Sequence, residues 1–179
     1  LLQVASGAVY DNEGNSHVID TARYELIISL IKERTHSIVA FNWTHERDAL
    51  CKLADKEGLT FAVIDGSVSI SERTEIVKHY QKGAYQVLFA HPQSAAHGLT
   101  LTKGVTTIWA SPTYNAEHFQ QFNRRIYRAG QTKKTETILI AARGTWEVAV
   151  YDKLDGKLNR MDSLLNLFKQ LTELEDGNN

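Results

Sequence analysis

Three closely spaced arginines give residues 121–131 the composition of an anion-binding site. The segment reads QFNRRIYRAGQ. At about 100° per residue, Arg124, Arg125 and Arg128 share one face of a predicted helix with Gln121. The opposite face is apolar and is expected to pack against the protein: Phe119, Phe122, Ile126 and Ala129. One face would therefore pack, and the other would be available for chemistry.

The residues around this segment add to its positive charge. No acidic residue occurs between Phe119 and Thr135, and Lys133 and Lys134 follow Gly130, where the helix is expected to end. The local field should therefore attract an anion. The alternative is that the arginines form a solvated surface or salt bridges, which is the common role of charged side chains on a helix.

The elements expected to position the arginines alternate between strand and helix. Short apolar runs predict five strands: Ser37–Phe41, Leu59–Ile64, Gln86–Ala90, Val105–Ala110 and Thr135–Ala142. Apolar residues at helical spacing predict helices over residues 21–34, 44–58, 69–83, 115–130 and 146–154. The expected N-caps are Asp20, Thr44, Ser69 with Glu72 in a capping box, and Asn115.

This alternation indicates an α/β fold in which helices cover both faces of a parallel sheet, a three-layer arrangement. In such sheets ligands bind beyond the carboxyl ends of the strands. The expected working surface is therefore the set of loops that follow four strands, after Phe41, Ile64, Ala90 and Ala110. Residues 1–20 are expected to be an irregular lead-in, 21–156 the domain, and 157–179 an amphipathic helix with an acidic tail.

Composition narrows the class of protein. The net charge of −1 excludes a uniformly basic surface, so attraction to nucleic acid must come from where the arginines lie. The single cysteine, Cys51, cannot form an internal disulfide and favours a reducing compartment. No apolar run reaches the roughly 18 residues of a membrane span, and a cytoplasmic location is expected. The spacing of His91 and His97 favours structural roles, and no metal site is predicted.

Several segments together resemble the second RecA-like motor lobe of superfamily 2 helicases, in the Swi/Snf-type chromatin-remodeller and phage-helicase branch. Residues 121–131 are similar to motif VI, with a glutamine, two arginines three residues apart and a final Gly-Gln. Residues 94–102 resemble motif V, although Thr100 stands where asparagine is usual and Ala95-Ala96-His97 replaces a glycine-rich lead. Residues 37–43 resemble motif IV, Asp65-Gly66-Ser67 the segment that follows it, and residues 144–147 the usual end of the lobe.

The resemblance implies that ATP binds in a cleft between two lobes and that this lobe supplies arginines to its phosphates. Arg125 and Arg128 would be catalytic, with Arg128 as the arginine finger. Gln121 and Gly98 would help to bind ATP. The Mg²⁺ ion that accompanies ATP would be held by the first lobe, which would be the N-terminal RecA-like lobe of the same polypeptide.

The resemblance also implies that a DNA strand crosses this lobe without recognition of its bases. The residues expected to contact the DNA backbone are Asn42, Thr44, Ser94, Thr100 and Thr102. Hydroxyl groups can grip phosphates without reading sequence. For Ser94, Thr100 and Thr102 a local cap or turn hydrogen bond is an equally good interpretation, and Thr44 is better explained as a helix N-cap.

Two features of a complete ATPase do not occur in the sequence. There is no G-x-x-x-x-G-K-[ST] loop to cradle phosphates and no Asp-Glu box for magnesium. The chain alone is therefore expected to be inactive and to require a first lobe upstream, and the initial Leu1 fits a fragment of a longer protein. The alternatives are a non-catalytic module that docks nucleic acid or protein, and an unrelated α/β domain for a small molecule.

Overall fold

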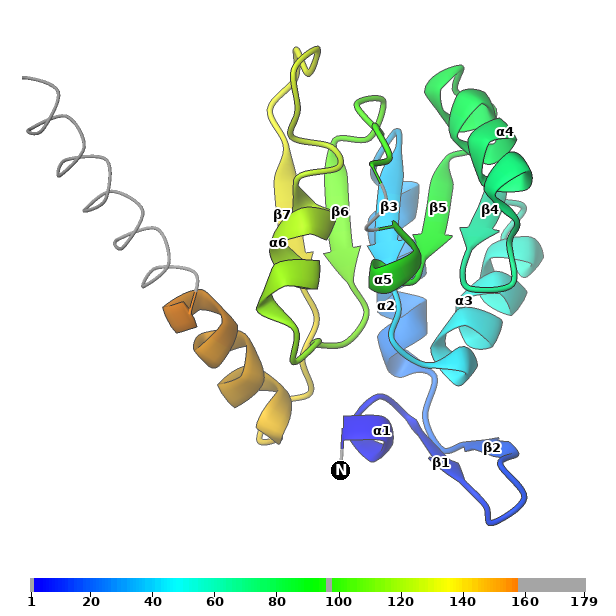
Figure 1. Ribbon diagram of the computed structural model, residues 1–179. Coiled ribbons are helices and arrows are strands. Elements are labelled where there is room, and N and C mark those ends of the chain that lie inside the picture. The colour runs from blue at the N-terminus through cyan, green and yellow to red at the C-terminus, as the bar shows by residue number, and fades with distance from the viewer. Residues whose placement is uncertain (1, 96–97, 158–179) are drawn as a thin grey trace, which may run out of the picture.

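A five-stranded parallel sheet forms the centre of the protein (Figure 1). The computed structural model describes residues 2–95 and 98–157. The strands are β3 (Ser37–Ala40), β4 (Phe61–Ile64), β5 (Val87–Ala90), β6 (Thr106–Trp109) and β7 (Glu136–Leu139). Their order in the sheet is β4-β5-β3-β6-β7, and every neighbouring pair is parallel. The predicted parallel sheet is confirmed, and each observed strand lies within its predicted range.

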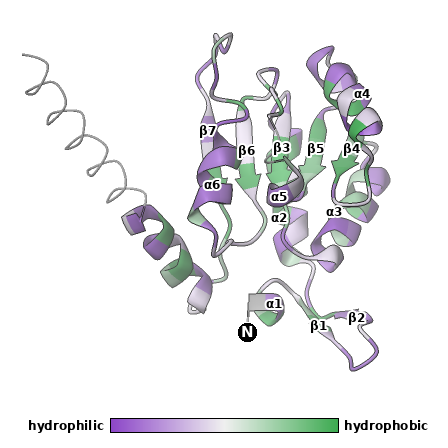
Figure 2. Cartoon of the chain, in the orientation of Figure 1, coloured by the Kyte–Doolittle hydropathy of each residue, from purple (hydrophilic) through white to green (hydrophobic). Residues whose placement is uncertain are grey.

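The central strand β3 sets the register of the sheet. Val39 pairs with Phe89 of β5 on one side and with Ile108 of β6 on the other. All four residues of β3, β5 and β6 are buried, as expected for strands that are covered on both faces. Figure 2 shows hydrophobic residues gathered in β3 and β5, whereas α4 (Ile70–Gln81) is largely hydrophilic.

Helices cover both faces of the sheet, which confirms the three-layer prediction. On one face lie α2 (Ala22–Lys32) and α3 (Thr44–Lys56), whose apolar residues pack against Val39, Phe89 and Ile108. The other face carries α4, α5 (Pro92–Ala95), α6 (Ala116–Asn123) and the helical residues 146–157. This second core includes Tyr80, Trp109, Phe119, Phe122, Ile126 and Tyr151.

Two of the predicted helix caps are present. The Ser69 hydroxyl accepts a hydrogen bond from the Glu72 N–H at 3.2 Å, while the Glu72 carboxylate accepts one from the Ser69 N–H at 3.0 Å, which completes the capping box of α4. The Asn115 side chain accepts a bond from the His118 N–H at 3.0 Å and caps α6. Both caps are local, which is why the sequence predicts them.

The other two predicted caps are wrong by one residue. Thr44 is the first residue of α3 rather than its cap, which is Trp43. The buried Glu46 carboxylate reaches back and accepts hydrogen bonds from the N–H groups of Asn42 and Trp43. At α2 the cap is Thr21, and the Asp20 carboxylate accepts a bond from the Ala22 N–H at 2.9 Å.

The first part of the chain is more regular than predicted. Residues 2–18 form α1 (Leu2–Ala5) and an antiparallel hairpin of β1 (Ala8–Tyr10) and β2 (Ser16–Val18). They lie beyond the carboxyl ends of the sheet strands (Figure 1). The hairpin is too short to be recognised from a pattern, and tertiary contacts to α3 hold it. The predicted closing helix and acidic tail of residues 158–179 lie outside the described residues.

Candidate functional site

The arginine-rich segment is mostly a loop, contrary to the prediction of a helix up to Gly130. Helix α6 ends at Asn123, Arg124 is its C-cap, and residues 124–130 form turns. The Asn123 side chain accepts a hydrogen bond from the indole N–H of Trp109 at 2.9 Å. The carbonyl of Arg125 accepts a hydrogen bond from the Leu101 N–H at 3.0 Å. In a continuing helix this carbonyl would instead accept from the N–H four residues later. We call residues 124–131 the arginine loop.

Because the helix ends early, the arginines do not share one exposed face. Arg125 is buried, with 6% of its surface exposed, whereas Arg124 and Arg128 are exposed. Burial, and then the charge of Arg128, lowers the pKa of Arg125 from its usual value. A guanidinium pKa starts so high that Arg125 stays charged. The sequence therefore identified the arginines, and the tertiary structure assigned them different environments.

The arginine loop lies against a second loop, residues 98–104, which we call the glycine loop. One terminal nitrogen of Arg128 donates to the Gly98 carbonyl at 3.4 Å, to the Leu99 carbonyl at 3.3 Å and to the Thr100 hydroxyl at 3.2 Å. A terminal nitrogen of Arg125 approaches the Leu99 carbonyl at 3.5 Å. These bonds are long, so the guanidinium of Arg128 is held loosely and can exchange them for a stronger acceptor.

Glycine allows the two loops to approach each other. A Cβ atom added at Gly104 would lie 2.7 Å from the Tyr80 hydroxyl and 3.0 Å from a methyl of Ile126. A larger residue there would push the arginine loop away. Gly98, at the other end of the glycine loop, has a positive φ of +66° and is exposed. Its backbone is therefore open to close approach by a ligand.

The two loops meet at the amino-terminal side of the sheet, away from the carboxyl-end loops that were predicted as the working surface. Gly104 comes two residues before β6 begins at Thr106, and the arginine loop contacts it there. The physical reason is that α6 runs back along the sheet after β6, so its end returns to the side where β6 began. The expected working surface therefore does not include the arginines.

The predicted site residues consequently divide into groups. Arg125, Arg128, Gly98 and Thr100 come together at the paired loops through the contacts just described. Thr102 lies in the glycine loop, where its hydroxyl accepts a bond from the Gln81 side chain at 3.1 Å. Ser94 is half-buried in the short helix α5. Gln121 is half-buried in α6 and donates to the Glu117 carboxylate at 2.8 Å.

The remaining predicted residues lie at the carboxyl end of β3. Asn42 donates from its side-chain nitrogen to the carbonyl of Ser111 at 2.9 Å and to its hydroxyl at 3.0 Å. These bonds join the segments that follow β3 and β6, so they use the amide hydrogens of Asn42 within the protein. Thr44 is exposed in the first turn of α3.

No carboxylate neutralises the exposed arginines within residues 2–95 and 98–157. The ion pairs found in these ranges involve other cations, and neither Arg124 nor Arg128 lies within 4.0 Å of a carboxylate oxygen. The absence of acidic residues in the sequence around the arginines favoured an unneutralised positive charge, and the described structure agrees. Arg128 therefore keeps its charge available at the surface.

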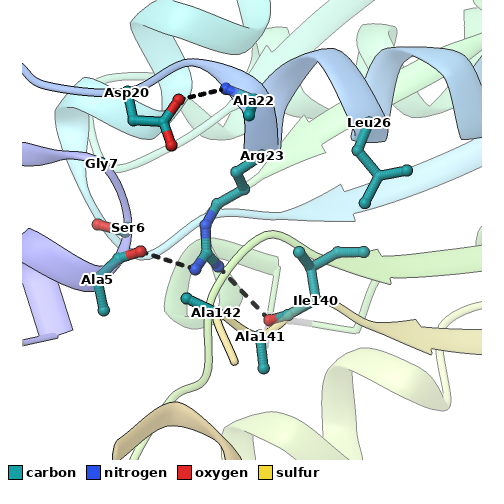
Figure 3. A pocket seen from close by; sticks show the side chains of 10 residues that line it. All are labelled: Ala5, Ser6, Gly7, Asp20, Ala22, Arg23, Leu26, Ile140, Ala141 and Ala142. Atoms are coloured by element: carbon teal, nitrogen blue, oxygen red, sulfur yellow. Dashed lines mark hydrogen bonds between the residues drawn. The ribbon is translucent and has the colours of Figure 1, made fainter. Parts of the chain in front are cut away.

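The structure contains a buried ion pair, outside this site, that the sequence did not predict. Arg23 of α2 and Glu147 of the final described helix are 2.5 Å apart, with side chains 8% and 0% exposed. Arg23 also donates to the carbonyls of Ala5 at 2.8 Å and Ile140 at 3.5 Å (Figure 3). It donates as well to the Ala110 carbonyl at 2.5 Å. The three elements it joins are 18 to 117 residues away in sequence, so no local pattern reveals it.

This guanidinium lines a cavity of about 260 Å³ between the lead-in, α2 and the segment after β7 (Figure 3). Its terminal nitrogens already donate to three carbonyls and a carboxylate, so they have no capacity to bind an anion there. The cavity is therefore not a binding site for an anion. It lies beside a structural joint, in which the buried Arg23 connects the start and the end of the described fold.

Further polar groups are buried beside this joint. Burial raises the pKa of Glu46 to about 7, although hydrogen bonds from Ser111 and from the Asn42 and Trp43 backbones oppose the shift. The neighbouring His45 ring lies 2.9 Å from the Ser6 hydroxyl and 2.9 Å from the Tyr10 hydroxyl. Burial lowers the pKa of His45. A neutral imidazole can donate with one nitrogen and accept with the other, which suits a link between α3 and the lead-in.

The described residues include no cluster of three His, Cys, Asp or Glu side chains that could hold a metal ion. Among the same residues, no helix is both long enough and apolar enough to span a bilayer. His91 is half-buried and packs edge-on against Phe41 with ring centres 5.9 Å apart, whereas His97 lies outside the described residues.

Comparison with known proteins matches residues 22–130 to the family model described as the helicase conserved C-terminal domain. The matched range contains both the glycine loop and nearly all of the arginine loop. Putative protein p41 of Acyrthosiphon pisum secondary endosymbiont phage 1 is 28% identical over 95% of this chain and 37% of its own length. The SNF2 domain-containing protein ENL1 of Oryza sativa subsp. japonica is 34% identical over 70% of this chain and 13% of its own.

A third relative is the human DNA annealing helicase and endonuclease ZRANB3, which is 32% identical over 64% of this chain and 11% of its own length. The chain thus spans between about a tenth and two fifths of these relatives. Among solved structures, the C-terminal part of the Fun30 ATPase domain superimposes with a TM-score of 0.69 at 16% identity. That match covers 73% of this chain and 44% of the other, and it supports the same RecA-like fold.

Proposed function

We propose, from the premise that the chain belongs to the helicase conserved C-terminal domain family, that it is the second motor lobe of a DNA-dependent ATPase. Its relatives include SNF2-type proteins and a DNA annealing helicase, which makes a Swi/Snf-type helicase or translocase the best-supported class. The N-terminal RecA-like lobe of the same polypeptide would be its partner. The fold match argues against an unrelated domain for a small molecule.

One observation carries this proposal: two arginines three residues apart lie on a loop that is packed against the glycine loop. Arg128 is exposed, makes only long bonds to that loop and has no carboxylate partner among the described residues. Phosphoryl transfer develops charge on the γ-phosphate oxygens, and a guanidinium presents donors that match them. We assign Arg128 as the arginine finger and the buried Arg125, which approaches the same Leu99 carbonyl, as the second arginine of the phosphate site.

The residues of the paired loops fit a triphosphate in charge and in access. Arg128 supplies an available cation, and the backbone at Gly98 is open because a Cβ there would meet no atom within 4 Å. Gln121 would reach ATP only by giving up its bond to Glu117. When bound, ATP with Mg²⁺ would supply the scissile phosphoanhydride bond, and the first lobe would hold the metal.

We propose DNA contacts in two places, along the glycine loop and at the carboxyl ends of β3 and β5, where α3 and α5 begin. The Thr102 hydroxyl oxygen accepts from Gln81, so its own hydrogen is available to donate to a phosphate. Thr100, Ser94 and Thr44 offer further hydroxyls at exposed or half-buried positions. Contact by Asn42 would require it to give up its two bonds to Ser111. None of these groups implies recognition of particular bases.

Activity is expected only when both lobes are present. The chain by itself should hydrolyse no ATP above the buffer rate, because it lacks groups that cradle the phosphates and hold Mg²⁺. The protein carrying both lobes should hydrolyse ATP and do so faster when DNA of any sequence is added. A phosphate-release assay on the two proteins measures this.

Two results would count against this proposal. Hydrolysis by the single lobe would contradict a site shared between lobes. DNA binding by the two-lobe protein without any hydrolysis would favour the alternative of a non-catalytic docking module.

The hydroxyl of Thr102 can be tested without changing charge or shape. Thr102→Val in the two-lobe protein is expected to lower DNA affinity about 10-fold, because one hydrogen bond to a charged phosphate is lost. Thr102→Ser, which keeps the hydroxyl, should bind as the wild type does. Fluorescence anisotropy with two duplexes of unrelated sequence measures both variants. A loss confined to one duplex would argue for base recognition instead.

A further inference from the structure

Gln131, the last residue of the arginine loop, has every polar atom of its side chain engaged. Its amide nitrogen shares its two hydrogens among three carbonyls, those of Thr102 at 3.0 Å, Gly104 at 2.9 Å and Ile126 at 3.0 Å. Its amide oxygen accepts from the Lys133 N–H at 3.0 Å. A single half-buried side chain at the end of the arginine loop therefore connects Ile126 of that loop with the glycine loop.

The chemistry of these contacts requires an amide. Three carbonyl oxygens surround one nitrogen, so the group at that point must donate and must not accept. The oxygen on the other branch must accept from a backbone N–H. A carboxylate would place an acceptor against three carbonyls, and an alanine would leave them without a donor. Only a side chain with both functions at this length satisfies the whole set.

These contacts also enclose Arg128. The Gln131 backbone N–H donates to the Arg128 carbonyl at 3.0 Å, and the Gln131 side chain bonds to Ile126, two residues before Arg128. Gln131 thus holds the turn around Arg128 twice, with its backbone at Arg128 itself and with its side chain at Ile126. Arg125 is held in the same frame, since its carbonyl accepts from the Leu101 N–H in the glycine loop.

We propose that Gln131 is a positioning residue that fixes the arginine loop on the glycine loop and thereby sets where Arg128 meets the γ-phosphate. This inference rests on the proposed function, since it assigns a role within that site. Gln131 itself does not touch the nucleotide. Its effect is geometric, and a misplacement of about 1 Å is enough to reduce the rate of an enzyme as much as 100-fold.

The test uses Gln131→Glu and Gln131→Ala in the protein carrying both lobes. At saturating ATP and DNA, kcat should fall about 10- to 100-fold, while the KM for ATP changes less than about 3-fold because the first lobe holds most of the nucleotide. DNA affinity should stay within about 3-fold of wild type, because Gln81 still holds Thr102. Thr132→Ala, an exposed neighbour, is the matched control and should behave as the wild type.

A double variant separates positioning from a general loss of structure. If Gln131 acts through Arg128, adding Gln131→Ala to Arg128→Ala should lower kcat little further. A full additional loss, or a variant whose kcat is normal below its melting temperature, would overturn the inference and leave Gln131 with a stabilising role only. If Arg128→Ala itself is fully active, the proposed function fails first, and this outcome is distinct from a failure confined to Gln131.

Discussion

Replacing Arg128 with alanine in the protein that carries both lobes is expected to lower the DNA-stimulated ATPase rate about 10³-fold or more, the lower end of the range for arginine fingers in GTPases. The reason is that the guanidinium stabilises charge that develops on the phosphate oxygens only in the transition state. The loss should therefore appear in kcat, with a much smaller change in the KM for ATP. Steady-state phosphate release at saturating DNA measures both constants.

Arg124→Ala is the matched control for this experiment. Arg124 is exposed, lies four residues earlier and carries the same charge, yet it is the C-cap of α6 and has no part in the proposed site. Its removal should change the rate less than about 3-fold, which corresponds to the small effect of an exposed charge. Arg128→Lys should remain defective, because an ammonium cannot present the guanidinium's fork of donors. A wild-type rate for Arg128→Ala would rule out the arginine finger.

The second large effect is expected on stability rather than on activity. Glu147→Ala removes the buried partner of Arg23 and should lower the free energy of unfolding by about 3–5 kcal/mol, because an uncompensated charge remains in the interior. Arg23 would keep its carbonyl acceptors, but the carboxylate that balances its charge would be gone. The Ala142 N–H would also lose its acceptor on Glu147. Urea denaturation of this chain, followed by circular dichroism, measures the change.

An exposed ion pair of similar geometry provides the control. Lys32 and Glu57 are 2.7 Å apart, but their side chains are 52% and 37% exposed. Lys32→Ala should cost at most about 1 kcal/mol, since water screens the pair and already solvates both charges. Equal losses for the two variants would show that burial does not decide the strength of the Arg23–Glu147 pair. The lead-in should also become more susceptible to proteolysis in Glu147→Ala, because Arg23 connects to it through Ala5.

Local features of the chain were enough to predict the strands of the sheet, most of the helices that cover it and the class of fold. Strand runs such as Ser37–Phe41 and caps such as Ser69 and Asn115 depend on residues within four positions of one another. Alternation of those elements then specifies a parallel sheet covered on both faces. The motif spacing in residues 94–102 and 121–131 likewise placed the chain among the helicases, which the family match confirms.

The arrangement of the site depended on contacts between residues that are distant in sequence. A helical pattern continued through Ile126, yet α6 stopped at Asn123. The Leu101 N–H binds the Arg125 carbonyl, a backbone acceptor that a longer helix would use, and the Trp109 indole holds the Asn123 side chain. Because the chain leaves the helix after Asn123, Arg125 is buried and Arg128 is exposed. The link from Gln131 to the glycine loop and the pair of Arg23 with Glu147 also join separate segments.

The sequence by itself therefore determined the parallel α/β lobe and singled out the residues that we propose for the chemistry: two arginines, a glycine-led loop and a set of hydroxyls. Only the tertiary structure decided which of them meet, how deeply each is buried and which side of the sheet they occupy. The physical reason is that propensity and periodicity act over a few residues, whereas hydrogen bonds and burial are satisfied by whichever segments the fold brings together.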